Sequence, residues 1–452
     1  MGENTNKKTV YLLSLGCAKN QVDSEHILAE ALSLGYHKVA AACEAGLIII
    51  NTCGFIESAK QESINEILEH GQFKTQGQQL IVAGCLSQKY TEALKTEIPE
   101  ADFFTGVYQP GNMRRLILEK IHKEQTSHIS NCEPELFSNR VFIDEKSHHA
   151  FLKVSEGCNR SCGFCAIPGI RGKQRSRTIN DIVKEACTLQ SKGVQEVSLI
   201  AQDLSAYGTD LGSVKGQFLP ELLRALIADT DISWIRLMYA YPDNIADELL
   251  DIISNEKRVC NYLDMPVQHA STNVLKLMRR GYDNQGLRDL LMRIRKAVPD
   301  ISLRTTLLLG HPGETEDDFT SLIDFIEEMR FERLGGFIYS EEEDTWAAKK
   351  LHGMNVTQNI AQERLNRVME IQQDISFELN QQKVGCSLDV IIDEQLTSGG
   401  EFQYVGRTMA DAPEVDNAVY IKGTGLKPGG IIPVTIKNAW EFDLEGKATS
   451  LE

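Results

Sequence analysis

The sequence predicts an α/β protein built from three consecutive domains. The chain has 452 residues, a length typical of about three domains. Strand-like and helix-like stretches alternate through most of the chain, which favours parallel sheets covered by helices. Near the end the pattern changes to short strands separated by glycine turns, which is typical of a small antiparallel β-barrel.

The first domain is expected over residues 8–125 as a parallel α/β domain. Its strand-like apolar runs lie at residues 9–15, 47–50 and 80–83. A helical pattern follows each run, at residues 23–33, 57–70 and 87–96. This alternation predicts a parallel sheet, whose strands all end at one edge.

A cysteine follows each of these three strands: Cys17, Cys53 and Cys85. The carboxyl ends of parallel strands form the edge of an open sheet where ligands collect. A single buried cysteine is usually inert, but three at equivalent strand ends favour a shared site. If the three thiols converge, they can hold an iron–sulfur cluster with one iron left open. The cysteines without such a placement are interpreted as structural or incidental: Cys43, Cys132, Cys187, Cys260 and Cys386.

The second domain is expected over residues 147–383, after a polar linker at residues 126–146. Six strand-like runs alternate with helical patterns and lie at residues 150–155, 196–201, 234–239, 261–265, 301–309 and 334–339. Six such units predict a partial (β/α)6 TIM-like barrel. Its working face should be formed by the carboxyl ends of the strands.

A loop after the first of these strands carries Cys158, Cys162 and Cys165, with Phe164 before the last. This CxxxCxxC spacing can bind three irons of a four-iron cluster and leave the fourth open to a cofactor. A zinc site would rather show paired CxxC units or Cys/His mixtures with four protein ligands. A disulfide is disfavoured because the thiols are odd in number and close together.

Polar residues follow the other strands and predict a pocket above the barrel. Gln202 and Asp203 follow the second strand, His269 the fourth, and Gly310 and His311 the fifth. Arginines at 171, 175 and 177 form either a solvated basic stretch or contacts to a cofactor carboxylate and an anionic cluster. Arg304 lies within the fifth strand, where an arginine needs an anionic partner such as a carboxylate of the cofactor or of the pocket.

The last domain is expected over residues 384–452, with strands at residues 387–392, 402–407, 418–421 and 431–438. Residues 383–452 carry a net charge of −5, and the whole chain carries −17. A barrel that binds nucleic acid is expected to be basic, so strong nucleic-acid binding is not expected. The segment with Asp411, Glu414 and Asp416 is a candidate surface for a basic protein substrate.

Eleven cysteines in a chain of this length do not form a disulfide scaffold and suit a reducing compartment. The polar start and the absence of an apolar run of membrane-spanning length predict no signal peptide and no membrane helix. The expected location is the cytoplasm.

Together these motifs resemble the methylthiotransferases, a branch of the radical S-adenosylmethionine (SAM) enzymes, over nearly the whole chain. The matching segments are Leu15-Gly-Cys-Ala-Lys-Asn20, Asn51-Thr-Cys53, Gly84-Cys85, Gly157-Cys-Asn159 with Cys162 and Cys165-Ala-Ile-Pro168, Asp264-Met-Pro-Val-Gln-His269, Arg304-Thr-Thr306 and Gly310-His-Pro-Gly-Glu-Thr315. The last domain looks like the TRAM domain of this family.

Three details resemble the RimO branch, which modifies a ribosomal protein, rather than the branches that modify tRNA. They are Cys17-Ala-Lys-Asn20 in place of a Gln-Met-Asn form, the acidic run at residues 339–345, and the acidic segment at residues 405–416. The chain departs from the family pattern at Ala201, where glycine is usual, and at Asp344, where glycine is common.

The resemblance implies that a methylthio group is inserted at the β-carbon of one aspartate in small-subunit ribosomal protein twelve. It implies SAM as radical source and methyl donor, two [4Fe-4S] clusters on the six cysteines, and an electron donor such as flavodoxin or ferredoxin. The residues expected near the cofactor, from the cysteine loop and the strand ends, are Phe164, Gln202, Asp203, Arg304 and Gly310. The alternatives are a tRNA adenosine 2-methylthiotransferase with the same chemistry and a non-catalytic iron–sulfur factor associated with ribosomes.

Overall fold

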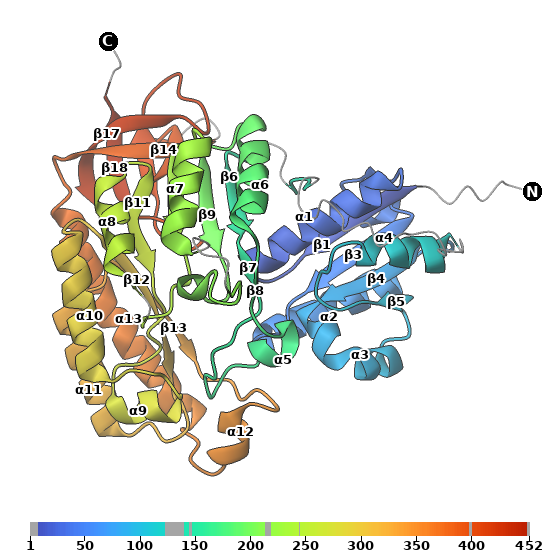
Figure 1. The fold of residues 1–452 in the computed structure, drawn as a ribbon, viewed down its shortest axis with the longest axis horizontal. Helices are drawn as coiled ribbons and strands as arrows, with labels where there is room; N and C mark the ends of the chain where they lie inside the picture. The colour runs from blue at the N-terminus through green and yellow to red at the C-terminus, as the bar shows by residue number, and fades with distance from the viewer. Residues whose placement is uncertain are drawn as a thin grey trace, which may run out of the picture. The chain divides into compact units, whose positions relative to one another are not determined.

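The computed structural model of the chain describes residues 8–122, 140–143, 147–212, 218–243, 245–396 and 400–449 (Figure 1). These residues form two compact units. The first contains the described residues up to 143 together with 156–159 and 166–173, and the second contains 147–155, 160–165 and the described residues from 174 onward. The CxxxCxxC loop is divided between them, because Cys158 packs with the first unit and Cys162 and Cys165 with the second. Most of the predicted linker at 126–146 lies outside the described residues.

The first unit is built on a five-stranded sheet in the order β2-β1-β3-β4-β5 with parallel pairing throughout. The strands are β1 (Thr9–Ser14), β2 (His37–Lys38), β3 (Leu47–Thr52), β4 (Gln79–Gly84) and β5 (Phe103–Phe104). All six residues of β3 are buried, as expected for a parallel strand covered on both faces. Its alternate residues enter two separate apolar clusters, with Leu47 and Ile49 in one and Ile48 and Ile50 in the other.

Helices cover this sheet, and short turns complete the unit. They are α1 (Ala18–Ser33), η1 (Ala42–Glu44), α2 (Glu57–Gln72), α3 (Cys85–Glu97), α4 (Asn112–Leu116), η2 (Ile117–Ile121) and α5 (Ile167–Arg171). The two edge strands, β2 and β5, were not predicted because each has only two residues, too few to show a period.

The second unit contains a six-stranded parallel sheet in the order β13-β12-β11-β10-β9-β6. Its strands are β6 (His149–Lys153), β9 (Glu196–Ile200), β10 (Trp234–Leu237), β11 (Val259–Asp264), β12 (Ser302–Leu309) and β13 (Arg333–Ile338). The short strands β7 (Ser155–Glu156) and β8 (Arg175–Ser176) flank the cysteine loop in the sequence. The predicted partial barrel is therefore confirmed, with strand bounds within two residues of those expected.

The helices of this part of the chain lie between the sheet strands in the sequence, as in a βα repeat, except for the last two, which follow β13 (Figure 1). They are α6 (Ile179–Ser191), η3 (Leu204–Ala206), α7 (Leu219–Asp229), α8 (Asp247–Asn255), α9 (Thr272–Leu277), α10 (Asn284–Ala297), α11 (Glu316–Met329), α12 (Trp346–Lys350) and α13 (Gln358–Gln381). None of the helices that the structure describes is long and apolar enough to cross a membrane.

The last domain is a closed five-stranded barrel in the order β14-β15-β16-β18-β17. Its strands are β14 (Ser387–Gln395), β15 (Tyr404–Thr408), β16 (Val419–Lys422), β17 (Ile431–Ala439) and β18 (Leu444–Ala448). Sequence analysis missed β18, which has glycine at its centre and little β-branched character. Gly446 is needed for packing, since a Cβ there would meet the Val434 side chain at 2.3 Å. The β16–β18 pair is parallel, whereas the other pairs are antiparallel.

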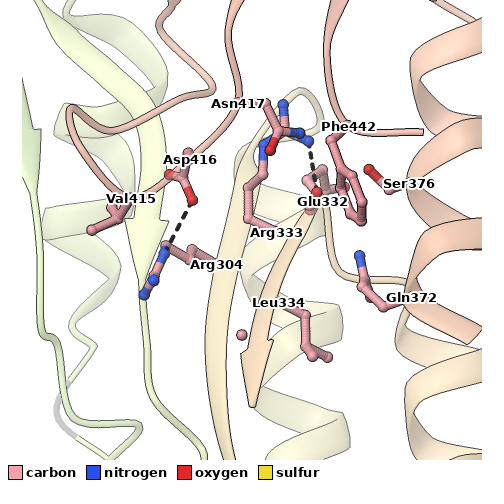
Figure 2. A pocket seen from close by; sticks show the side chains of 11 residues that line it. Arg304, Glu332, Arg333, Leu334, Gln372, Ser376, Val415, Asp416, Asn417 and Phe442 are labelled. Carbon is pink, nitrogen blue, oxygen red and sulfur yellow. Dashed lines mark hydrogen bonds and ion pairs between the residues drawn. The ribbon is translucent and has the colours of Figure 1, made fainter. Parts of the chain in front are cut away.

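Buried ion pairs join this small barrel to residues of the six-stranded parallel sheet. Glu196 on β9 is fully buried and contacts Arg236 at 2.8 Å and Arg407 at 2.9 Å. Arg304 on β12 lies 3.1 Å from Asp416, and Figure 2 shows the two side chains facing one another. Arg333, at the start of β13, pairs with Asp411. These contacts hold the two domains together within one compact unit.

The expectation that Asp411, Glu414 and Asp416 form one acidic substrate surface is wrong for two of the three. The side chains of Asp411 and Asp416 are only 2% and 3% exposed. Burial alone would raise the pKa of Asp411, but Arg333 and Lys383 outweigh it and hold that pKa below its usual range. Only Glu414 is exposed. The sequence shows the acids but not the arginines that fold back onto them.

We predict that Asp411→Asn destabilises the protein by about 3–5 kcal/mol, because it leaves Arg333 buried without a counter-charge. Glu414→Gln, in the same loop but exposed, serves as the matched control and should change the free energy of unfolding by less than about 0.5 kcal/mol. Urea unfolding followed by circular dichroism measures both. Because the pKa of Asp411 is lowered by folding, its contribution is present above the ordinary aspartate pKa and is lost as the pH falls below it. Equal stability of the two variants would contradict the assignment.

Candidate iron–sulfur sites

The three cysteines of the first unit stand at the carboxyl ends of neighbouring strands. Cys17 caps the start of α1 after β1, Cys53 follows β3, and Cys85 begins α3 directly after β4. The β1 and β3 loops touch, because a Cβ on Gly16 would lie 2.9 Å from the Cys53 sulfur. Gly16 also has a positive φ of 91°, a conformation that glycine adopts readily. The predicted common sheet edge is therefore present.

Asn20 ties these loops together. Its amide nitrogen donates to the backbone oxygens of Leu15 at 2.9 Å and Thr52 at 2.8 Å. Its side-chain oxygen accepts from the Cys85 sulfur at 3.7 Å and from Arg171 at 2.6 Å. This one residue therefore contacts all three strand ends.

Arg171 is buried beside the same cysteines. Its guanidinium donates to Asp23 at 3.1 Å and to Glu156 at 2.9 Å, both within the first unit. Burial raises the pKa of the Cys85 thiol to about 12, while Arg171 opposes this shift and Cys17 adds to it. Of the two readings left open for the arginines, a solvated stretch is excluded for Arg171. Its place favours screening of negative charge on the thiols of the first unit.

In the second unit, backbone hydrogen bonds hold the segment from Cys162 to Cys165. The Gly163 N–H donates to the Met278 carbonyl at 2.8 Å, and the Gly163 carbonyl accepts from the Ala347 N–H at 2.7 Å. A Cβ on Gly163 would lie 3.0 Å from the Leu277 carbonyl, so glycine permits this close approach. Phe164 packs in an apolar cluster with Tyr339, Trp346 and Leu351. The segment is thus clamped between the end of α9 and the start of α12.

Arg280 is a site residue that sequence reasoning missed. Its Nη1 lies 3.3 Å from the Cys162 sulfur and donates to it. The residue follows α9, far from the cysteine loop in sequence, and no local pattern singles it out. Only the packing of α9 against the loop brings the guanidinium to the thiol.

Asp203 and Gly310, both expected near the cofactor, have structural partners. Asp203 is buried and accepts from Arg160 of the cysteine loop at 2.6 Å. Gly310 has φ of 74°, and a Cβ there would meet that of Ala361 at 2.5 Å. The ion pair accounts for an aspartate at position 203, and the close packing accounts for a glycine at position 310, so neither residue requires a ligand. Contacts of Phe164, Gln202, Asp203 and Gly310 with a cofactor remain predictions.

Arg304 has carboxylates of the protein as partners, which is one of the two alternatives that the sequence left open, and a contact with the cofactor stays a prediction. Arg304 is the third residue of β12 and lies toward the amino end of that strand, whereas the cysteine loop follows the carboxyl end of β6. Its guanidinium pairs with Asp264 at 3.0 Å as well as with Asp416. Arg304 lines a cavity of about 150 Å³, and Arg333, Gln372 and Phe442 form other parts of its wall (Figure 2). The required anion is therefore a carboxylate of the protein.

Two histidines at the strand ends are buried and neutral. Burial lowers the pKa of His269 to about 3 and that of His311 to about 4. Next to Phe164, the His311 ring lies edge-on at 6.4 Å and packs against Tyr339 at 5.3 Å. The His311 Nε2 and the Tyr339 hydroxyl are buried without a hydrogen-bond partner among the described residues. Such unpaired polar atoms are costly.

Both sets of cysteines combine thiol donors with a nearby arginine, which is the chemistry that an iron–sulfur cluster would need. Among the described residues, no three His, Cys, Asp or Glu side chains lie close enough to hold one ion. A four-iron cluster spaces its thiolates farther apart than one ion does and takes three protein thiolates when one iron stays open. Arg280 at the barrel cysteines and Arg171 at the first set supply positive charge for such an anionic group.

Three family models match successive parts of the chain. An uncharacterized protein family, UPF0004, matches residues 9–106, the radical SAM superfamily matches 152–326, and the TRAM domain matches 384–449. The chain is 43% identical to the ribosomal protein uS12 methylthiotransferase RimO of Clostridioides difficile, over 97% of this chain and 98% of the relative. The protein of the same name from Lachnoclostridium phytofermentans is also 43% identical, over 97% and 99%.

Solved structures share the fold. The radical SAM methyltransferase TsrM from Kitasatospora setae, with cobalamin and a [4Fe-4S] cluster bound, superposes with a TM-score of 0.56. The match covers 87% of this chain and 81% of that chain, at 14% identity. At this identity the likeness shows a common architecture and nothing about the substrate.

We predict that, in metal-free protein at pH 8, iodoacetamide labels Cys17 quickly and Cys85 slowly. Cys17 is exposed and Cys85 is buried, and only the thiolate is the nucleophile. Since the pKa of Cys85 is raised to about 12, its thiol stays protonated throughout the neutral range. Peptide mass spectrometry measures each site, with exposed Cys43 as the internal reference. Labelling of Cys85 as fast as Cys17 would contradict the described burial.

Proposed function

The chain belongs to the family of ribosomal protein uS12 methylthiotransferases named RimO, and on this basis we propose that it methylthiolates the β-carbon of an aspartate in uS12. As a radical SAM protein it uses SAM and a [4Fe-4S] cluster. We assign residues 8–125 to the methylthiotransferase domain, 147–383 to the radical SAM domain and 384–452 to the TRAM domain.

The observation that carries the proposal is the placement of six cysteines in two sets. Cys158, Cys162 and Cys165 follow the first strand of the radical SAM domain, and Cys17, Cys53 and Cys85 end three parallel strands of another domain. Insertion of sulfur into an unactivated C–H bond requires both hydrogen abstraction and a sulfur donor. Two separate three-thiol sites match these two tasks.

When bound at the barrel cysteines, the cluster and SAM supply one-electron cleavage of SAM and a radical strong enough to abstract hydrogen from carbon. The chain contributes the enclosure. Phe164, Tyr339 and Trp346 form an apolar wall beside the cysteine loop, which keeps water from a reactive site. His311 is neutral at pH 7 because burial lowers its pKa to about 4. It can therefore accept a hydrogen bond at Nε2 without adding positive charge.

We assign the second cluster to Cys17, Cys53 and Cys85. Cys53 and Cys85 are buried, and burial raises the pKa of both thiols. A bound metal removes the thiol protons, and Arg171 lies where it can offset the resulting negative charge. If bound there, the cluster would be held by Cys17, Cys53 and Cys85 and would supply the sulfur to be inserted, and SAM would supply its methyl group.

The substrate assignment agrees with the charge of the chain, which is −17. Ribosomal proteins are usually basic, so a negative surface field speeds their approach. Phosphate-rich tRNA would be repelled by the same field. The particular acids that face the substrate are not Asp411 and Asp416, whose charges are used inside the protein. We expect a flavodoxin or ferredoxin to supply the electron.

We predict that the anaerobically reconstituted protein, given SAM and a reductant, adds one methylthio group to uS12 and none to bulk tRNA. Mass spectrometry of the protein and nucleoside analysis of the RNA measure the two outcomes in parallel. Modification of tRNA alone would favour the tRNA enzyme. Failure to cleave SAM despite a full complement of iron would favour a non-catalytic iron–sulfur factor.

We predict that replacing Cys17, Cys53 and Cys85 by alanine removes about half of the iron and abolishes methylthio transfer. Formation of 5′-deoxyadenosine from SAM should persist, because the barrel cysteines are intact. The matched variant, with Cys158, Cys162 and Cys165 replaced by alanine, should also lose about half of the iron but make no 5′-deoxyadenosine. Full methylthio transfer by the first variant would refute the second cluster site.

A further inference from the structure

Arg280 differs from the other arginines around the cysteine loop in what it contacts. It follows a chain reversal at Arg279, which has a positive φ of 56°. Its Nε donates to the Tyr282 hydroxyl at 2.6 Å and its Nη2 to the Pro266 carbonyl at 2.6 Å. The remaining branch, Nη1, reaches the Cys162 sulfur at 3.3 Å.

No carboxylate among the described residues forms an ion pair with Arg280. Arg160, in the cysteine loop itself, pairs with Asp203 at 2.6 Å and Asp243 at 2.5 Å. Both guanidiniums lie over the Tyr241 ring, at 3.9 Å and 4.1 Å from its centroid. A guanidinium enclosed by aromatic rings needs a counter-charge. For Arg280 the group in reach that can carry one is the thiolate of Cys162.

The guanidinium is also held in place independently of that thiol. The Tyr282 hydroxyl, which accepts from Arg280, donates in turn to the Val267 carbonyl at 3.2 Å. The Tyr241 and Tyr282 rings pack with centroids 5.6 Å apart. A donor fixed in this way loses little freedom when it binds a ligand, so its hydrogen bond is pre-organised.

We propose that Arg280 is a positioning residue that hydrogen-bonds the Cys162 thiolate of the barrel cluster and raises the midpoint potential of that cluster. Reduction adds negative charge to a cluster, and a cationic donor on a ligand sulfur stabilises the reduced form more than the oxidised form. The hydrogen bond therefore makes it easier for a biological donor to load the electron used on SAM. This inference rests on the barrel cluster of the proposed function.

The test is an anaerobic redox titration of the full-length chain followed by electron paramagnetic resonance. Cys17, Cys53 and Cys85 are replaced by alanine in every sample, so that the barrel cysteines hold the cluster being titrated. Arg280→Met in this background should move the midpoint to a more negative potential. The matched control is Arg279→Met, which removes the same charge from the neighbouring, exposed residue that lies over Trp346. It should leave the midpoint unchanged.

An unchanged midpoint in Arg280→Met at normal iron content overturns the proposal, and so does an equal shift in Arg279→Met. If Arg280→Met does not retain the cluster, Arg280→Lys decides the matter. Lysine keeps the charge but cannot make the three directed bonds, so its midpoint should also lie below that of the parent. A midpoint equal to that of the parent overturns the proposal. If the parent protein itself binds no iron, the result counts against the proposed function. Failure of the proposed function can therefore be distinguished from failure of the Arg280 proposal.

Discussion

The structure depends on one geometric constraint, that parallel strands deliver the residues after them to a common edge. In the first unit, β1, β3 and β4 are neighbours in the sheet, so three cysteines separated by more than thirty residues each reach the same edge. In the second unit, the six parallel strands place Cys162, Cys165, His269, His311 and Tyr339 after strand ends in the same way. The chemistry proposed here follows from that placement rather than from any single motif.

Charge is used inside the molecule as well as on its surface. Arg236, Arg304, Arg333 and Arg407 meet carboxylates where the small barrel packs on the strands, and Arg171 meets Asp23 and Glu156 beside the first cysteines. Removing one member of such a pair is costly because the other stays buried. An acidic composition is therefore a poor guide to which acids face a partner. Aspartate and glutamate give the surface its negative charge, and the same residue types also form the buried ion pairs.

The fold could be predicted from sequence because its signals are local. Apolar runs such as 47–52 and 302–309 are long enough to show strand period, and the change to glycine turns marks the last domain. The six cysteines were found because thiols in that spacing have few other uses. Short elements without a period were missed, such as β2 and β18. So were contacts made by residues distant in sequence, namely Arg280 on Cys162 and Arg304 on Asp416. These depend on how helices and loops pack, which no single segment of the sequence encodes.

The central claim is that one chain holds two clusters, each on three cysteines with an open iron. Mössbauer spectroscopy of the anaerobically reconstituted protein, combined with iron and sulfide analysis, tests it most directly. The account predicts about eight irons per chain, all in [4Fe-4S] clusters, and a change in the spectrum of about half of them when SAM is added. About four irons per chain, all of them responding to SAM, would contradict the claim.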